Sequence, residues 1–288
     1  GRRYQEDMRI LCFGKDGLLS TALHAWLPEL RPLSLDFLSK SECDITNKDE
    51  VNEAFSKYRP THVINAAAYT KVDDSEDNIP LVNLINGFAL EHIVSACNTH
   101  SAIPIHFSTD YIFNGKKEGA YEEGDDPIPL NAYGESKLIG EKCIRDRLVE
   151  HYILRVQWVF GAAKPNFIST IINLAKEKGE VQVVNDQFGS PTSTTAISKA
   201  VVNLLFNSPA FGTYHFRTLK HTTWYDLAVF FIEKCKVDAA VVPVPSSERK
   251  TKAKRPKNGV LNIGKWIYSD LYTPPTWQND VLSYLEKE

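Results

Sequence analysis

The sequence of 288 residues predicts an α/β fold in which helices cover both faces of a parallel sheet. Two observations carry this prediction. Short apolar runs of the kind that form buried strands alternate with helical patterns over the first 160 residues. The first of these runs is followed by a glycine-containing turn that leads directly into a helix. Beyond Gly161 the alternation is less regular, which indicates a second, smaller α/β domain.

The elements of the first half are predicted from their apolar spacing and their caps. Thr46 or Asn47 is a suitable cap for the second helix, with Asp49 or Glu50 three residues further on. The expected strands are residues 9–13, 33–36, 61–65, 103–107 and 152–156. The expected helices are residues 21–27, 47–58, 78–99 and 133–147. The core stripe of the third helix is predicted to be Leu81, Leu84, Ile85, Phe88, Ile93 and Val94.

Two polar features interrupt this apolar pattern. Asn83 and Asn86 lie within the third helix, where one of them is placed to bond the backbone of a neighbouring loop, or both are simply exposed. His106 lies inside the fourth strand, and we interpret it as a packed residue rather than a catalytic base.

The second half is predicted to contain helices at 165–179 and 194–207, a helix starting at Thr222, and strands near 183, 212–216 and 241–244. A threonine cap and Asp226 in the first turn mark the start of the helix after Thr222. Residues 246–258 are basic and irregular. We therefore expect a nucleotide-binding domain at 8–160 and a mainly substrate-binding domain at 161–288, with residues 194–220 returning to the first.

Composition excludes several classes of function. A net charge of −3 gives no field that would gather nucleic acid or an anionic membrane. No apolar run is expected to reach the length of a membrane span, and no signal-peptide pattern is present at the start. The five cysteines are scattered, so we expect free thiols and a cytoplasmic protein. Residues 1–7 are polar and are left out of the fold prediction.

The first turn has the pattern G-x-x-G-x-x-S, from Gly14 through Gly17 to Ser20. A glycine-rich turn of this kind lets the backbone approach a pyrophosphate, which the helix N-terminus then stabilises. A plain strand-to-helix turn can have the same pattern. Asp36 lies about 20 residues beyond this turn, where an acid binds the adenosine ribose and disfavours a 2′-phosphate. Ser39 and Lys40 follow and would suit that phosphate, so NADH and NADPH both remain open.

A second motif is the pair Tyr133 and Lys137, which share one face of a predicted helix. A nearby ammonium group favours the phenolate, so we expect Lys137 to lower the pKa of Tyr133 and suit it to proton transfer. Upstream, Ser108 and Thr109 end an apolar strand, and a hydroxyl there is expected to contact the same substrate oxygen. Such a Tyr–Lys pair also occurs on ordinary surface helices. Together with the glycine turn, it indicates hydride transfer.

These motifs give the chain, after residue 7, a resemblance to the extended short-chain dehydrogenase/reductases, and within them to the dTDP-4-dehydrorhamnose reductases. The resemblance rests on residues 13–17, 65–73, 108–113, 133–141, 184–192, 222–226 and 255–258. It implies a Rossmann-type doubly wound parallel sheet and NADPH- or NADH-dependent reduction of the C4 keto group of a nucleotide sugar. We expect a monomer or homodimer.

The resemblance also implies roles for individual residues. The catalytic set would be Thr109, Tyr133 and Lys137, with the last two also touching the cofactor. The rest of the cofactor site would be Gly14, Gly17, Leu18, Leu19, Asp36, Asp44, Ile45, Ala68, Tyr69, Thr70 and Phe107. The substrate would be touched by Thr109, Asp110, Val72, Trp158 and Arg255, the last at the diphosphate. No metal site is expected.

Two alternatives remain open from the sequence. One is a non-catalytic, NADP-binding regulatory subunit resembling the methionine adenosyltransferase β subunit. The other is a related reductase that acts on a UDP-sugar.

Overall fold

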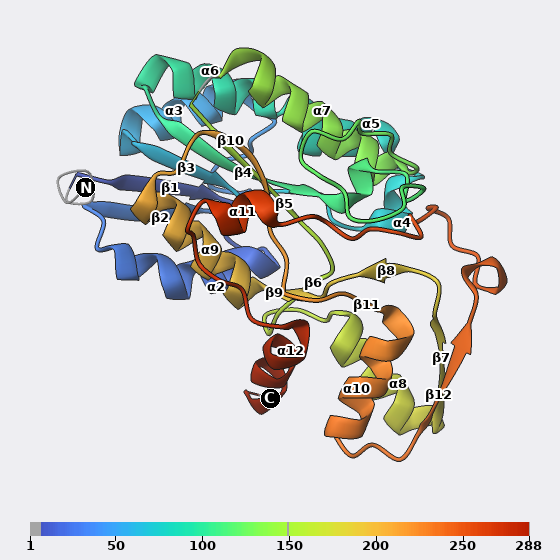
Figure 1. The fold of residues 1–288 in the computed structure, drawn as a ribbon. Helices are drawn as coiled ribbons and strands as arrows, with labels where there is room; N and C mark the ends of the chain where they lie inside the picture. Colours follow the sequence, from blue (N-terminus) through green and yellow to red (C-terminus); the bar gives the residue numbers. More distant parts are fainter. Residues whose placement is uncertain (1–6, 149, 288) are drawn as a thin grey trace.

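The computed structural model describes residues 7–148 and 150–287, so the N-terminal residues 1–6 lie outside the described part of the chain. Within the described part, a six-stranded parallel sheet has the strand order β10-β5-β4-β3-β1-β2 (Figure 1). Its strands are β1 (Arg9–Phe13), β2 (Ser34–Leu38), β3 (His62–Asn65), β4 (Ile103–Thr109), β5 (Tyr152–Val156) and β10 (Gly212–His215). The predicted parallel sheet is confirmed.

Strand β1 lies between β2 and β3, so the chain runs outward to β2 and then crosses back to β3. This is the switch point of a doubly wound sheet, where a crevice opens at the carboxyl ends of the strands. Helices cover both faces, as predicted. They are α2 (Leu18–Trp26), α3 (Lys48–Tyr58), α6 (Leu90–His100), α7 (Ala132–Arg147) and α9 (Thr194–Asn207).

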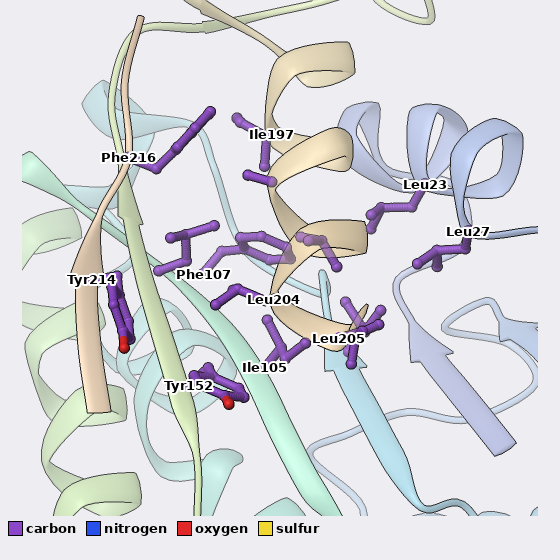
Figure 2. Close-up of a cluster of buried hydrophobic side chains, with 14 of the residues drawn as sticks. Leu23, Leu27, Ile105, Phe107, Tyr152, Ile197, Leu204, Leu205, Tyr214 and Phe216 are labelled. Carbon is purple, nitrogen blue, oxygen red and sulfur yellow. The ribbon is translucent and has the colours of Figure 1, made fainter. Parts of the chain in front are cut away.

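Each face of the sheet has its own apolar core. On one face, α2 and α9 pack in a common core with the central strands, and Figure 2 shows Leu204 of α9 near Ile105 and Phe107 of β4, with Leu23 of α2 on the other side of α9. On the other face, α3, α6 and α7 cover β1, β3 and β5. Because side chains alternate along a strand, His106 and Ser108 of β4 point towards the face opposite to that of Ile105 and Phe107.

A buried ion pair connects α7 to the sheet. Glu141 of α7 is fully buried and accepts hydrogen bonds from Arg155 of β5, at 2.7 and 3.0 Å. It also accepts a hydrogen bond from Ser108 of β4 and one from Arg145 at 2.5 Å. Arg155 in turn donates to His215 of β10 at 3.1 Å. The helix that carries Tyr133 is therefore tied to three strands.

The predicted helix at 78–99 is wrong in part. It consists of α5 (Ile79–Asn83), a π-helical turn η2 (Leu84–Phe88) and α6 (Leu90–His100). Ile93 and Val94 are buried as predicted, but three members of the predicted stripe are 41–48% exposed: Leu81, Leu84 and Phe88. The reason is the closeness of α7, because a Cβ on Gly87 would lie 2.7 Å from Cγ2 of Ile139. Only a small residue fits that face.

The polar residues of this region have defined places. Asn86 is buried, accepts from the backbone N–H of Tyr69 at 2.8 Å and donates to its carbonyl at 3.0 Å, which confirms a backbone contact from this helix. His106 is buried as expected, and its Nδ1 accepts from Asn65 at 3.2 Å. The π-helical turn is what directs Asn86 towards the loop, since such turns re-aim side chains.

The second half forms a lobe of its own, drawn at the lower right of Figure 1. Its core is an apolar cluster shared by its helices and a two-stranded parallel sheet. The elements are α8 (Phe167–Lys178), β7 (Glu180–Val184), α10 (Trp224–Lys234), β12 (Ala240–Val244) and α12 (Trp277–Glu286). Thr223 caps α10, as predicted. By contrast, α9 and β10, from the same half of the chain, pack onto the first sheet.

The sequence did not predict the helices α11 and α12. The elements not yet described are short. They comprise η1 (Leu27–Leu30), α4 (Val72–Ser75), η3 (Asp110–Ile112), β6 (Val159–Phe160), β8 (Phe188–Gly189), β9 (Thr192–Ser193), β11 (Thr222–Thr223), η4 (Ser246–Glu248) and α11 (Gly264–Tyr268). All five cysteines are free thiols.

The prediction that no apolar run reaches membrane-spanning length is wrong on length and composition. The helical stretch Ile79–His100, 22 residues long, is sufficient by those two measures. Its buried side chains, however, pack in the core with α3 and α7, as expected of the central helix of a folded domain.

Candidate active site

The carboxyl ends of β1, β3, β4 and β5 meet at one edge of the sheet, and most of the predicted site residues follow these ends. Gly14 and Gly17 follow β1, Ala68 follows β3, Thr109 ends β4, and Trp158 follows β5. The topology therefore gathers at one edge residues that lie far apart in the sequence.

The turn after β1 requires its first glycine. Gly14 has a φ of +86°, and a Cβ there would lie 2.6 Å from the backbone nitrogen of Ala67. Gly17 is the N-cap residue of α2 and has no side chain. The first N–H groups of this helix, at Leu18 and Leu19, therefore have no side-chain cap. A close backbone turn beside an uncapped helix N-terminus fits the pyrophosphate of a dinucleotide.

Ser20, at the position of the third glycine, is buried at 1% exposure. Its hydroxyl has no hydrogen-bond partner among the described residues. The side chain is small enough to be enclosed in the helix–sheet interface, so the departure from glycine does not displace α2.

The predicted adenosine residues lie along β2 and the loop after it. Asp36 is the third of five residues in β2, so the expectation that this strand ends in a carboxylate is wrong. The strand continues because the carbonyl of Leu38 accepts hydrogen bonds from Gly14 and Lys15. Asp44 accepts two hydrogen bonds from Thr46, at 3.0 and 2.7 Å, and Ile45 is buried.

The loop after β3 borders the same edge. Tyr69 is held at its backbone N–H and carbonyl by the amide of Asn86, and Ala68 and Thr70 flank it. Phe107 of β4 is 7% exposed and belongs to the core below the edge. Asn86, which fixes this loop and also donates to Ser136 of α7 at 3.0 Å, was not among the predicted site residues.

Helix α7 brings Tyr133 and Lys137 to the end of β4. Asn131 caps the helix by accepting from Gly134 at 2.8 Å. A Cβ on Gly134 would lie 2.1 Å from the carbonyl oxygen of Tyr111, so the helix rests directly on the backbone that follows Thr109. The rings of Tyr111 and Tyr133 meet edge to face, with centroids 6.3 Å apart.

The electrostatics of this pair differ from the prediction. The pKa of Tyr133 is raised, not lowered, chiefly by burial and then by Asp110 and Tyr111. Burial lowers the pKa of Lys137 to about 8, and Glu141 opposes that change. Burial therefore sets the direction of both shifts. A phenol that stays protonated at neutral pH is suited to donating a proton rather than accepting one.

Thr109 and Asp110 lie beside this tyrosine and are both buried. The Thr109 hydroxyl accepts from the backbone N–H of Tyr111 at 3.1 Å and donates to Oδ1 of Asp110 at 3.3 Å.

The predicted sugar residue Trp158 has an unusual conformation. Its φ is +48°, a left-handed value that costs a bulky residue about 1–3 kcal/mol. Its indole stacks on that of Trp224, with centroids 3.6 Å apart and planes 12° apart. Gly189 lies on the ring as well, because a Cβ there would approach it to 2.5 Å. Trp224, which the sequence did not single out as a site residue, holds Trp158 in place.

Arg255 and Val72 lie near one another in the structure. Arg255 forms a bidentate ion pair with Asp73, at 2.9 and 3.2 Å, and Asp73 is the residue after Val72 at the start of α4. The guanidinium is therefore already paired. Arg255 also lowers the pKa of the Asp73 carboxyl through that hydrogen bond.

A cavity of about 1350 Å³ opens between the two lobes. Arg255 lines it, whereas Val72, Asp110 and Trp158 are not among its lining residues. Its aromatic walls are Tyr111, Phe167 and Trp224, and its basic side chains include Lys116, Lys250, Lys254 and Lys257. The cavity thus extends from the neighbour of Tyr133 to the basic segment 246–258. Over residues 7–148 and 150–287, no group of three His, Cys, Asp or Glu side chains is arranged to hold a metal ion.

The chain is similar to known proteins over nearly all of its length. The family described as the RmlD substrate binding domain matches residues 8–288. A dTDP-4-dehydrorhamnose reductase of Escherichia coli is 36% identical, over 97% of this chain and 98% of that protein. The structure resembles that of a dTDP-4-dehydrorhamnose reductase from Bacillus anthracis in complex with NADP, with a TM-score of 0.93, 29% identity and coverage of 98% and 100%. It also resembles that of a dTDP-4-dehydrorhamnose reductase from Clostridium acetobutylicum, described as an RfbD orthologue, with a TM-score of 0.93, 32% identity and coverage of 97% and 99%.

Proposed function

The chain belongs to the RmlD substrate binding domain family, and from this premise we propose that it reduces the C4 keto group of dTDP-4-dehydro-β-L-rhamnose, with NADPH or NADH, to dTDP-L-rhamnose. The observation that supports the proposal best is the juxtaposition of α7 and β4. Tyr133 lies beside the backbone that follows Thr109, and the neighbouring Tyr111 opens onto a cavity large enough for a nucleotide sugar.

The residues of the first domain fit a dinucleotide cofactor. Gly14 and Gly17, with the N–H groups of Leu18 and Leu19, would hold the pyrophosphate, and the turn at Gly14 leaves no room for a side chain. The adenosine end would lie by Asp36, Asp44 and Ile45, and the nicotinamide end by Ala68, Tyr69, Thr70, Phe107 and Lys137. When bound, NADPH or NADH supplies the hydride.

The chain's own side chains would handle the proton and the charge. Tyr133, which is protonated at neutral pH, would donate its proton to O4 as negative charge develops there. Thr109 would donate a hydrogen bond to the same oxygen as a preorganised dipole. Lys137, with a pKa of about 8, would carry positive charge at neutral pH and offset the phenolate that remains.

Residues of both lobes would hold the rest of the substrate. Val72, Asp110 and Trp158 are proposed to border the sugar. Arg255 is proposed near the diphosphate, although its pairing with Asp73 leaves most of the positive charge to the lysines that line the cavity. The place of these residues in the fold and the chemistry of their side chains together support these roles. We also propose a cytoplasmic enzyme; the expected monomer or homodimer stays a prediction.

The deciding test is turnover. Oxidation of NADPH and of NADH should be followed separately with freshly prepared dTDP-4-dehydrorhamnose and with the corresponding UDP-sugar. We expect rapid oxidation with the dTDP-sugar. Cofactor binding without oxidation of either sugar would favour the regulatory-subunit alternative instead.

The role of Tyr133 is tested by Tyr133→Phe, which removes only the hydroxyl. We expect unchanged cofactor binding and a loss of turnover of about 10²–10⁴-fold, the usual range for a general acid. Tyr268→Phe is a matched control, because Tyr268 lies on α11 and is 93% exposed. Near-normal turnover of Tyr133→Phe would exclude it as the proton donor.

A further inference from the structure

Gln157, directly after β5, is a buried amide whose orientation is determined by its neighbours. Its Oε1 accepts from the backbone N–H of Ser190 at 3.2 Å. Its Nε2 donates to the carbonyl oxygen of Gly259 at 2.5 Å and to Oδ2 of Asp110 at 3.3 Å. Because a backbone donor lies at one end and a backbone acceptor at the other, only the N–H end of Gln157 can face Asp110.

Asp110 is enclosed on its other sides. It is 2% exposed, and a Cβ on Gly259 would lie 2.5 Å from its Oδ2. Its Oδ1 accepts from the Thr109 hydroxyl at 3.3 Å. Over the described residues, its two oxygens interact with the Gln157 amide, the Thr109 hydroxyl and its own backbone N–H, and none of these donors is a cationic side chain. Gln157, Asp110 and Thr109 thus form a buried chain that ends at the proposed substrate oxygen.

The direction of the hydrogen bond between Thr109 and Asp110 matters because a hydroxyl has only one proton to donate. When Asp110 is ionised it can only accept, so the proton of Thr109 is directed at Asp110 and not at the substrate. When Asp110 carries a proton, its own O–H can donate to Thr109. The hydroxyl of Thr109 is then free to donate to the substrate.

We propose that Asp110, oriented by Gln157, sets the direction of the Thr109 hydroxyl, and that reduction proceeds with Asp110 in its neutral form. The proposal rests on the proposed function and assigns Gln157 as a positioning residue. No proton leaves Asp110 in the step: hydride reaches C4, the Tyr133 proton reaches O4, and Asp110 acts through hydrogen bonds alone.

The electrostatic surroundings agree with the geometry. Burial raises the pKa of Asp110 to about 7, opposed by its hydrogen bonds from Gln157 and Thr109. The ionisable groups that face it are Tyr111 and Tyr133, whose own pKa values are raised by burial and by Asp110. The Arg255–Asp73 ion pair lies beyond Tyr111. A neutral Asp110 would also avoid repelling the phenolate that Tyr133 becomes.

The kinetic test is the pH dependence of kcat in the wild type, Gln157→Leu and Asp110→Asn. For the wild type we expect kcat to fall about tenfold per pH unit above about pH 7. In Gln157→Leu the ionised form loses a donor, so the fall should begin about one pH unit higher. In Asp110→Asn the fall that begins near pH 7 should be absent, and only the fall above about pH 8 that follows loss of the Lys137 charge should remain. A reduced kcat with an unchanged pH profile in Gln157→Leu would mean a merely structural role and would overturn the proposal.

A matched control and a second readout keep the test decisive if Asp110→Asn turns over too slowly. Gln278 lies on α12, and its buried Oε1 has no partner among the described residues, so Gln278→Leu should leave the profile unchanged. The carboxyl of Asp110 can also be followed by NMR with ¹³C-labelled aspartate and assigned by its loss in Asp110→Asn. Titration near pH 7 that moves upward in Gln157→Leu supports the proposal; titration in the ordinary range near 4 would refute it. This readout does not depend on turnover, so failure of the proposed function would be recognised separately.

Discussion

The burial of Asp110 leads to a prediction about stability that is independent of activity. A carboxyl whose pKa is raised by burial makes the folded state more favourable when protonated and less favourable when ionised. The stabilising effect of the proton is therefore present at low pH and is lost as pH rises through the folded-state pKa of about 7. Asp110→Asn removes the titration while retaining an acceptor for Gln157.

The size of the effect on the free energy of unfolding follows from the shift in the pKa of Asp110. A rise from 3.8 to about 7 corresponds to about 4 kcal/mol of unfavourable free energy once the group is ionised in both states, at about 1.4 kcal/mol per unit. At pH 5 the folded carboxyl is still protonated, so less than half of that cost, about 1–2 kcal/mol, is present. Between pH 5 and pH 8.5 the wild type should therefore lose about 2–3 kcal/mol of unfolding free energy that Asp110→Asn does not lose.

The assay is urea unfolding of both proteins at pH 5 and pH 8.5, with thermal unfolding in parallel. For a chain of this size, 2–3 kcal/mol corresponds to roughly 5 °C in Tm. The variant should be the more stable protein at pH 8.5, and this advantage should shrink by about 2–3 kcal/mol at pH 5. Asp270→Asn is the control, because that aspartate is exposed. An identical pH dependence for the wild type and Asp110→Asn would show that Asp110 ionises normally, which would refute the reasoning.

Three further substitutions test the framework around the site. Arg155→Met leaves the fully buried Glu141 without its main partner and should lower the unfolding free energy by about 3–5 kcal/mol, measured by urea unfolding. Gly14→Ala places a Cβ in a left-handed turn and should weaken NADPH binding about tenfold in a fluorescence titration, since that conformation costs about 1–2 kcal/mol. Gly189→Ala would push a methyl group into the Trp158 ring and should raise the KM for the sugar while cofactor affinity is unchanged.

The fold was predictable because its signals are local. Each strand of the first sheet except β10 is announced by an apolar run before a polar loop, and the helix caps at Asn47 and Thr223 are readable from two or three residues. The carboxyl edge then follows from topology, since parallel strands end together. This is why Thr109 and Tyr133 could be predicted to lie close together although 24 positions separate them.

What could not be predicted depends on distances between residues far apart in sequence. The exposed stripe of Leu84 and Phe88 is one case. Helical spacing marks these residues as core, and only the contact of Gly87 with Ile139 shows that α7 occupies the opposite face. The pairing of Arg255 with Asp73 is another, because a basic run in the sequence has no visible partner 182 residues away.

The pKa of Tyr133 shows why a correctly identified motif can still predict the wrong direction for a pKa shift. The spacing of Tyr133 and Lys137 implies attraction between an ammonium and a phenolate, which lowers a phenol's pKa. The spacing carries no information about desolvation, which the fold imposes on both groups and which raises one pKa while lowering the other. A raised pKa keeps the phenol protonated but also makes it a weaker acid, so in reduction the positive charge on Lys137 would have to stabilise the phenolate as it forms. The helix that presents the pair is anchored by Glu141, one turn further along the same face, so the burial that tunes the tyrosine and the ion pair that positions it come from a single helical stripe.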